Sequence, residues 1–204
     1  MTGEFEYTPY GKTPRLFGGN CIITEKMHGT NGVLIFDEQG NMKVGSRKRE
    51  LGPWPGEDKV RDNYGFYAWA SERQRELFQL LGTGVHHGEW VGEGIEGNKH
   101  EFDCKMFLLF DTSPRRMEWY DHYSNVMAAL EIWHVPVMYE GKFMPGIVER
   151  MMDELEHRGR WAEGVIVRLQ SADWAPMKVT FANDGHTLSQ GKWDSPLPGE
   201  EVLA

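Results

Sequence analysis

Short apolar runs separated by turn residues make up much of this chain, and they constrain its fold more than any other feature. Runs of this length, bounded by Gly, Asn, Asp and Pro, predict β-strands rather than long helices. We assign strands to Cys21–Glu25, Gly32–Asp37, Met42–Gly45, Val85–Val91, Met106–Asp111, Gly164–Leu169 and Pro176–Phe181. Gln39, Gly40 and Asn41 lie between two of these runs and predict a hairpin turn.

Helical periodicity is confined to three segments: Tyr67–Leu81, the region His122–Trp133, and Pro145–Arg158, where Pro145 suits a first helical turn. Because these helices are few and do not alternate regularly with the strands, we expect an α+β fold. Its sheets would be mostly antiparallel and flanked by helices, rather than one doubly wound parallel sheet. We expect residues 1–204 to form a single domain with an irregular tail from about residue 183.

Composition and charge exclude several classes of protein. The chain has 204 residues, of which 40% are hydrophobic, so it can form a core and is not a disordered segment. Its apolar runs are too short to cross a membrane, and its first residues lack a secretion signal. Cys21 and Cys104 have neither disulfide-framework nor metal-ligand spacing, which favours a cytoplasmic location. The net charge of −9 excludes a protein that coats nucleic acid by bulk positive charge.

One stretch runs against this acidic balance. Residues 43–61 carry a net charge of +3, and aromatic residues at Trp54, Tyr64 and Phe66 interleave with or follow the basic ones. The basic residues are Lys43, Arg47, Lys48, Arg49, Lys59 and Arg61. This mixture suits phosphate contacts and base stacking. A solvated basic hairpin without a ligand is the alternative interpretation.

A lysine follows the first predicted strand, in the segment Lys26-Met27-His28-Gly29-Thr30-Asn31. Glycine allows the backbone to approach a ligand closely, and the end of a strand holds a side chain on a rigid element. An unprotonated lysine amine is a good nucleophile. The simpler alternative is a strand, a turn and a surface lysine.

Further polar residues recur at the ends of predicted strands. Glu89 lies near the end of one strand, and Phe107–Asp111 is an apolar strand closed by an acid. Glu163 begins the segment Glu163-Gly164-Val165-Ile166-Val167-Arg168, where a carboxylate could hold a metal ion. Lys178 is a compact point charge suited to a phosphate group.

Taken in order, these segments resemble the motifs of the covalent nucleotidyltransferases, which comprise DNA ligases, RNA ligases and mRNA capping enzymes. The Lys-x-His-Gly-Thr-Asn form of the first motif is most similar to the RNA ligase 2 branch. The resemblance extends from Glu25 to Thr180 and includes five motifs in the expected order. It implies the ligase and capping-enzyme fold, without an appended OB domain.

The resemblance also implies a reaction and its main residues. Lys26 would attack the α-phosphate of ATP and carry AMP, which then passes to the 5′-phosphate of an RNA end before sealing to a 3′-OH. Glu163 would bind Mg²⁺ or Mn²⁺, and Lys178 would contact the AMP phosphate. These groups would act by positioning and by offsetting negative charge.

Other positions would bind ATP or the nucleic acid. By the same resemblance, Glu25 would help to read the adenine and Glu89 would hold the ribose hydroxyls. Phe110 would stack on the adenine, with Phe107 as second choice. Asn31 and Arg47 would contact the RNA end, Arg47 near the ribose and phosphate as well. Arg168 occupies the position where the RNA ligase branch carries a lysine after its Glu-Gly run.

Two departures from the family pattern leave alternatives open. Thr180 stands where the last motif usually has a second lysine, unless Arg168 or Lys192 supplies that charge. Only a short acidic tail follows, so nucleic acid, whether RNA ends or a nicked duplex, would bind this domain's own face or need a protein partner. A weak or inactive nucleotide- or RNA-end-binding protein, or a DNA ligase, are the alternatives.

A literal G-x-G-x-x-G at Gly92–Gly97 does not indicate a dinucleotide site. No helical apolar period follows it, and Glu93 and Glu96 would face a pyrophosphate with like charge.

Overall fold

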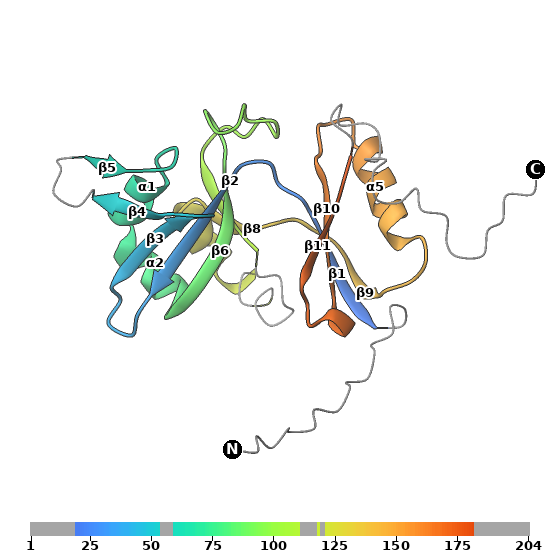
Figure 1. The fold of residues 1–204 in the computed structure, drawn as a ribbon, viewed down its shortest axis with the longest axis horizontal. Coiled ribbons are helices and arrows are strands. Elements are labelled where there is room, and N and C mark those ends of the chain that lie inside the picture. The colour runs from blue at the N-terminus through green and yellow to red at the C-terminus, as the bar shows by residue number, and fades with distance from the viewer. Residues whose placement is uncertain (1–18, 54–58, 111–117, 119–120, 182–204) are drawn as a thin grey trace, which may run out of the picture.

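Two β-sheets lie against each other, each covered on its outer face by helices (Figure 1). The structure is a computed structural model and describes residues 19–53, 59–110, 118 and 121–181. The smaller sheet has the order β11 (Pro176–Thr180), β10 (Gly164–Leu169), β1 (Asn20–Glu25), β9 (Val137–Lys142). The larger has the order β5 (Val60–Arg61), β4 (Glu50–Pro53), β3 (Met42–Ser46), β2 (Thr30–Phe36), β6 (Gly84–Val91), β7 (Met106–Leu109), β8 (Ile132–His134).

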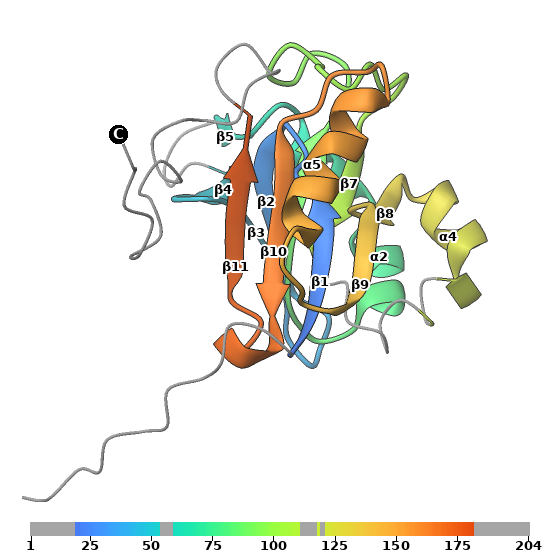
Figure 2. The same cartoon turned by 90° about the vertical axis from the view of Figure 1, so that its right-hand side faces the viewer.

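The helices are short and lie outside the sheets. They are α1 (Phe66–Glu72), α2 (Gln74–Leu81), α4 (Ser124–Ala129) and α5 (Ile147–His157), with a 3₁₀ turn at Gln170–Ala172. Figure 2 shows α5 lying across the outer face of the smaller sheet. Among the described residues, no helix is both long and apolar enough to span a membrane.

The predicted fold class is confirmed. Every strand pair in both sheets is antiparallel except β7 with β8, which is parallel. The β2–β3 hairpin also turns where expected: Gly40 has φ +79°, and the Asp37 carboxylate accepts hydrogen bonds from the backbone of Gln39 and Asn41.

Three helix predictions need correction. The segment Tyr67–Leu81 forms two helices that meet at Arg73, not one. The predicted helix at His122–Trp133 is too long, because α4 ends at Ala129 and the chain then enters β8. Helix α5 begins after Gly146, whose φ is +76°, so Pro145 precedes the helix instead of lying in its first turn. The tail from residue 183 lies outside the described residues.

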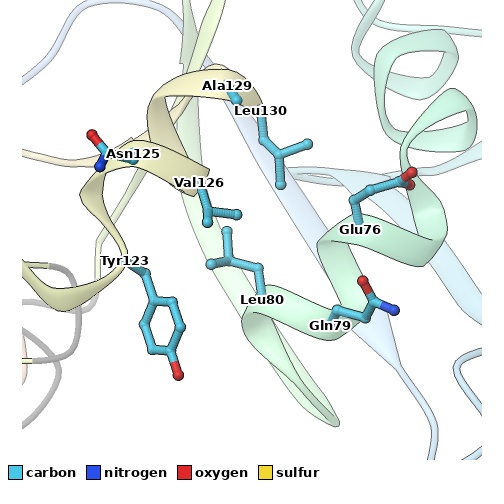
Figure 3. Close-up of a pocket in the computed structure, with 8 residues that line it drawn as sticks. All are labelled: Glu76, Gln79, Leu80, Tyr123, Asn125, Val126, Ala129 and Leu130. Atoms are coloured by element: carbon cyan, nitrogen blue, oxygen red, sulfur yellow. The ribbon is translucent and has the colours of Figure 1, made fainter.

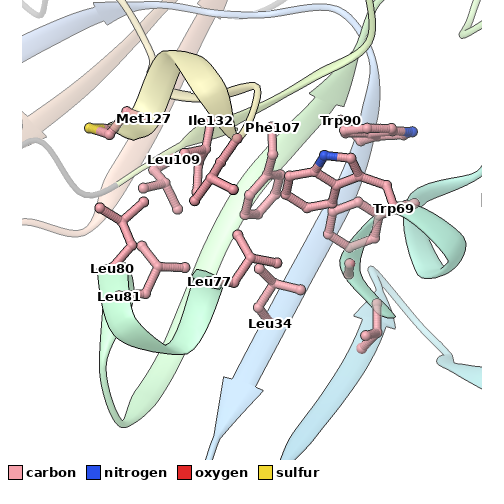
Figure 4. Packing of buried hydrophobic residues seen from close by; sticks show 14 of the residues in the cluster. Leu34, Trp69, Leu77, Leu80, Leu81, Trp90, Phe107, Leu109, Met127 and Ile132 are labelled. Atoms are coloured by element: carbon pink, nitrogen blue, oxygen red, sulfur yellow. The ribbon is translucent and has the colours of Figure 1, made fainter. Parts of the chain in front are cut away.

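Each sheet packs its outer face on its own helices. The larger sheet and α1, α2 and α4 bury an aromatic-rich cluster that includes Trp69, Trp90 and Phe107 (Figure 4). The smaller sheet and α5 bury a second cluster, with Ile23, Met152 and Val165 among its members. A third, small cluster forms where Met27, Val91, Leu108 and Val135 meet. Because side chains alternate along strands, the residues of opposite parity face the space between the sheets.

Candidate active site

A cavity of about 510 Å³ opens where strands of the two sheets end near each other. Its lining comes from the end of β1, the start of β2, the β3–β4 turn, β6, the start of β10, and β11. The lining residues are Lys26, His28, Gly29, Thr30, Asn31, Arg47, Glu89, Glu163 and Lys178. The structure therefore brings together six of the residues selected from the sequence, although they are spread over most of the chain.

Strand register places Lys26 beside Glu163. β1 pairs with β10 in antiparallel fashion up to Glu25 opposite Val165. The next residue, Lys26, donates its backbone N–H to the Gly164 carbonyl at 2.8 Å. Glu163 immediately precedes β10, so both side chains leave the sheet at the same end of this strand pair.

The two side chains form an ion pair. Lys26 Nζ lies 2.5 Å from Glu163 Oε1, and the side chains are 22% and 26% exposed. His28 Nδ1 lies 3.5 Å from the other oxygen, Glu163 Oε2. The lysine that the sequence suggested as nucleophile is thus held by a carboxylate, and a histidine two residues further along the chain faces the same carboxylate.

A tight turn follows Lys26, and it requires glycine. A Cβ on Gly29 would meet the Trp90 carbonyl oxygen and would come within 2.7 Å of Val91 Cγ1. The absence of a side chain lets this turn pack directly on β6. The backbone N–H of Gly29 can then donate a hydrogen bond to the Glu89 carboxylate.

Glu89 is the most perturbed acid in the cavity. It lies opposite Asn31 in the β2–β6 pair, and the Asn31 side chain donates a hydrogen bond to it. Burial raises the pKa of Glu89 to about 7; nearby Lys26 opposes that shift, and Glu163 adds to it. A carboxyl with this pKa is poised to change charge near neutral pH when a cation or ligand enters.

Two more cations come from elements on opposite sides of the cavity. Arg47 follows β3 in the turn to β4, and Lys178 lies in β11 opposite Ile166 of β10. Thr180 lies opposite Gly164 in the same pair. Val179 packs on the buried cluster beneath α5, so Lys178 and Thr180 project from the other face of the strand.

The cavity suits a divalent cation accompanied by phosphate. Glu163 Oε2 is buried and makes no hydrogen bond, an acceptor that a cation would satisfy. No group of three His, Cys, Asp or Glu side chains with metal-site geometry occurs among the residues that the structure describes. Mg²⁺ is commonly held by one or two carboxylates, with phosphates and water completing its shell. Glu163, with Glu89 nearby, matches that arrangement.

The aromatic candidates lie outside this cavity. Phe107, the second choice for stacking on adenine, offers no face to a ligand: it is 0% exposed and packs against Phe66 and Trp69 in the core. Phe110 does not join Phe107 in the large cluster; it packs against the small cluster that contains Met27. With Arg168 it lines a second cavity of about 440 Å³.

Glu25 also lies away from the cavity, although it directly precedes Lys26. Its side chain is 1% exposed, and its Oε2 accepts hydrogen bonds from Arg158 at 3.1 Å and Arg160 at 3.4 Å. These two arginines, which follow α5, were not predicted from the sequence. Neither was His100, whose ring lies 3.8 Å from Glu25. No local pattern marks these residues, because only the folded loops bring them to the strand end.

A further hollow of about 520 Å³ separates α2 from α4 (Figure 3). Its lining is largely apolar and includes Leu80, Tyr123, Val126 and Leu130. Glu76 at its rim is the one titratable side chain in the lining apart from Tyr123. It lacks the convergent charges that phosphate chemistry requires.

The fold matches solved RNA ligase structures. Naegleria gruberi RNA ligase with PPi shares 18% identity and a TM-score of 0.58, over 79% of this chain and 49% of that chain. Mutants of the same ligase with ATP and Mn, and with AMP and Mn, share 19% and 18% identity at a TM-score of 0.57, with the same coverage. The present chain thus spans about half the length of these ligases. At this identity the likeness establishes the fold.

Sequence comparison gives the family. No curated protein matches the sequence. The family model described as RNA ligase, however, matches residues 19–180. That range contains every strand and helix described above as well as the whole cavity around Lys26. The chain therefore belongs to the RNA ligase family.

Proposed function

We propose that this chain is the catalytic domain of an ATP-dependent RNA ligase in which Lys26 carries AMP. The observation that carries the proposal is the cavity itself. It places Lys26 against Glu163 and surrounds the pair with Arg47 and Lys178, two cations suited to phosphate groups. The RNA ligases of known structure with ATP and Mn or with AMP and Mn support the same nucleotide chemistry.

The first step is attack on ATP. Lys26, having lost its proton, forms an N–P bond to the α-phosphorus, and the bond from that phosphorus to the bridging oxygen breaks. Pyrophosphate leaves with the electron pair. A 5′-phosphate oxygen of RNA next displaces Lys26 from phosphorus, and a 3′-hydroxyl finally displaces AMP. Each step is a substitution at phosphorus, so the protein contributes mainly positioning and charge stabilisation.

Each lining residue has a role in that scheme. Arg47 and Lys178 offset the charge that develops at the α-phosphate, while Glu89 holds the ribose hydroxyls. Asn31 contacts the RNA end. A divalent cation at Glu163 would neutralise phosphate charge and would compete with Lys26 for the carboxylate, which favours the neutral amine. Phe110 stays our candidate for stacking on the adenine, whereas Glu25, 1% exposed and held by Arg158 and Arg160, does not face the cavity.

One observation favours a second candidate function. Thr180 projects from the same strand face as Lys178 but carries no charge. A site short of one cation would bind nucleotide or an RNA end yet react slowly, as a binding protein would. The proposal that the substrate is RNA and not DNA rests on the family alone. A cytoplasmic location and a partner that supplies further RNA contacts stay predictions.

Covalent trapping separates enzyme from binder. The protein is incubated with ATP labelled at the α-phosphate and Mg²⁺ or Mn²⁺, then run on a denaturing gel. A ligase retains the label on the gel. Lys26→Ala should fold, because Lys26 lies at a strand end outside the buried clusters, but it should not retain the label. Label that persists in Lys26→Ala would sink the assignment. Addition of RNA or DNA with a 5′-phosphate then identifies the strand that accepts the AMP.

A further inference from the structure

The loop between β6 and β7, residues 92–105, folds across the turn that carries Lys26. Three of its non-glycine residues, Glu96, Asn98 and Glu101, have positive φ angles between 44° and 55°. Such backbone is costly and persists where surrounding contacts hold it. Here the contacts are with His28: its backbone N–H donates to His100 Nε2 at 3.0 Å, and its ring Nε2 lies 3.2 Å from the Glu96 carbonyl oxygen.

The side chain of His100 lies buried beneath this loop. Its side chain is 4% exposed and lies between two aromatic rings, stacked on Phe102 at 5.6 Å and edge-on to Trp161 at 5.2 Å. Trp161 belongs to the segment between α5 and β10, just before Glu163. The ring thus joins a loop of the larger sheet to a loop of the smaller one.

The two ring nitrogens of His100 have different partners. Nε2 accepts the His28 backbone N–H, so in the neutral ring the proton lies on Nδ1. Nδ1 points toward Glu25 Oε1 at 3.8 Å, and that buried oxygen makes no hydrogen bond of its own. Burial, followed by the Arg160 and His28 charges, lowers the pKa of His100 to about 4, which keeps the ring neutral at pH 7.

We propose that His100 is a positioning residue for Lys26. It acts on Lys26 through Glu25, which precedes Lys26 in the chain, and through His28, which follows it. Its ring fixes the backbone of His28 and faces Glu25, so it fixes the direction in which Lys26 leaves β1. His28 in turn faces Glu163, the carboxylate that holds Lys26. His100 is not among the residues that line the cavity, so it would act on Lys26 and not on the substrate itself. This inference rests on the proposed function.

A misplaced nucleophile loses rate without losing affinity for its substrate. Small displacements of reacting atoms cost up to about a hundredfold in rate. His100→Phe keeps an aromatic ring but removes the acceptor for the His28 N–H. His100→Gln places an amide oxygen near the position of Nε2 and can restore that hydrogen bond. The pair therefore separates hydrogen bonding from ring packing, and His100→Leu replaces His100→Phe if the latter does not fold.

The test compares single-turnover AMP labelling of wild type, His100→Phe and His100→Gln over a range of ATP concentrations. Rates are normalised to the folded fraction found by thermal unfolding. We expect His100→Phe to lower the saturating rate about tenfold or more, with half-saturation by ATP within about threefold of wild type. His100→Gln should stay within about threefold in rate. A wild-type rate in His100→Phe, or equal losses in both variants, would overturn the proposal.

A second readout does not depend on ligase activity. Lys26 is acylated with an N-hydroxysuccinimide ester, and its modification rate is followed by mass spectrometry in the same three proteins. We expect His100→Phe to change the rate at Lys26 and to leave the exposed Lys142 unchanged, with His100→Gln like wild type. If wild type takes no AMP label, the proposed function fails. Equal acylation of Lys26 in all three proteins would then overturn the positioning role as well.

Discussion

At the scale of single residues, Glu89 and Glu163 show how one cavity imposes different demands on two carboxylates. Glu163 is paired with Lys26, and its second oxygen makes no hydrogen bond but lies 3.5 Å from His28 Nδ1. Glu89 is more deeply buried, so its charged form is costly until a ligand or cation arrives. A site arranged for ligand charge commonly gives up stability in the empty protein.

Glu89 predicts a specific dependence of stability on pH. Its pKa is about 7 in the folded protein, against an ordinary 4.5, so the folded state binds more protons between these values. The neutral carboxyl therefore adds about 3 kcal/mol at most to the free energy of unfolding below pH 4.5. This contribution is lost as the pH rises through 7. Glu89→Gln should equal wild type near pH 4.5 and exceed it by about 1–3 kcal/mol at pH 8.

Urea unfolding of both proteins at the two pH values checks this. The difference between variant and wild type isolates Glu89 from other titrating groups, His100 included, which has the opposite pH dependence. A difference that is the same at both pH values would show that Glu89 is not protonated in the folded protein near neutrality.

Glu163 predicts a loss of chemistry with little loss of stability. Glu163→Gln keeps the shape of the side chain and removes its charge, so AMP transfer should fall by at least about a hundredfold. The side chain is partly exposed, and pairs of this kind contribute about 1 kcal/mol or less, so the melting temperature should change little. A large drop in melting temperature would make Glu163 a structural carboxylate.

At the scale of secondary structure, the sequence predicts what local periodicity controls. Strands β1, β2, β3, β6, β7, β10 and β11 lie where their apolar runs are, within a few residues. β4, β5, β8 and β9 were not predicted. Ile132–His134 looked like the end of a helix, and it becomes a strand because β7 lies beside it, a contact between distant segments. The cavity residues could be selected from the sequence because they lie on these strands or directly beside them. His100, Arg158 and Arg160 could not, because they lie in loops that only the folded chain brings to the site.

The β11 strand predicts the effect of restoring a charge. Thr180 and Lys178 share a strand face, and Thr180 lies opposite Gly164, the residue that follows Glu163. Thr180→Lys should raise the single-turnover rate of Lys26 adenylation about tenfold, equivalent to roughly 1.4 kcal/mol of transition-state stabilisation. Thr180→Met adds length without charge and is the matched control. An unchanged or lower rate in Thr180→Lys would mean that another cation already serves the phosphate.

At the scale of the whole molecule, charge is distributed unevenly. The chain carries a net charge of −9, yet the β3–β4 turn presents three exposed cations, Arg47, Lys48 and Arg49, of which Arg47 also lines the cavity. Hydrogen bonds from the backbone and side chain of Ser46 to the Arg49 carbonyl hold this turn in shape. RNA would thus meet a short, fixed cationic element on an otherwise acidic protein.

This arrangement predicts the salt dependence of RNA binding. For single strands, each phosphate contact contributes about 0.7 to the slope of log affinity against log salt. Lys48→Ala should reduce the slope by about that amount, as measured by fluorescence anisotropy. Lys142→Ala, at the end of β9 opposite Asn20, serves as the control and should not change it. Equal slopes in both variants would place the RNA on another face.

The central claim is that Lys26, and no other lysine, carries the nucleotide. Peptide mapping by mass spectrometry after incubation with ATP and Mg²⁺ or Mn²⁺ tests it most directly. The reaction is stopped without acid, because acid would hydrolyse the phosphoramidate. The account predicts a single AMP adduct, on the peptide that contains Lys26 and at that residue. An adduct on Lys178 or another lysine, or no adduct in folded protein, would contradict it.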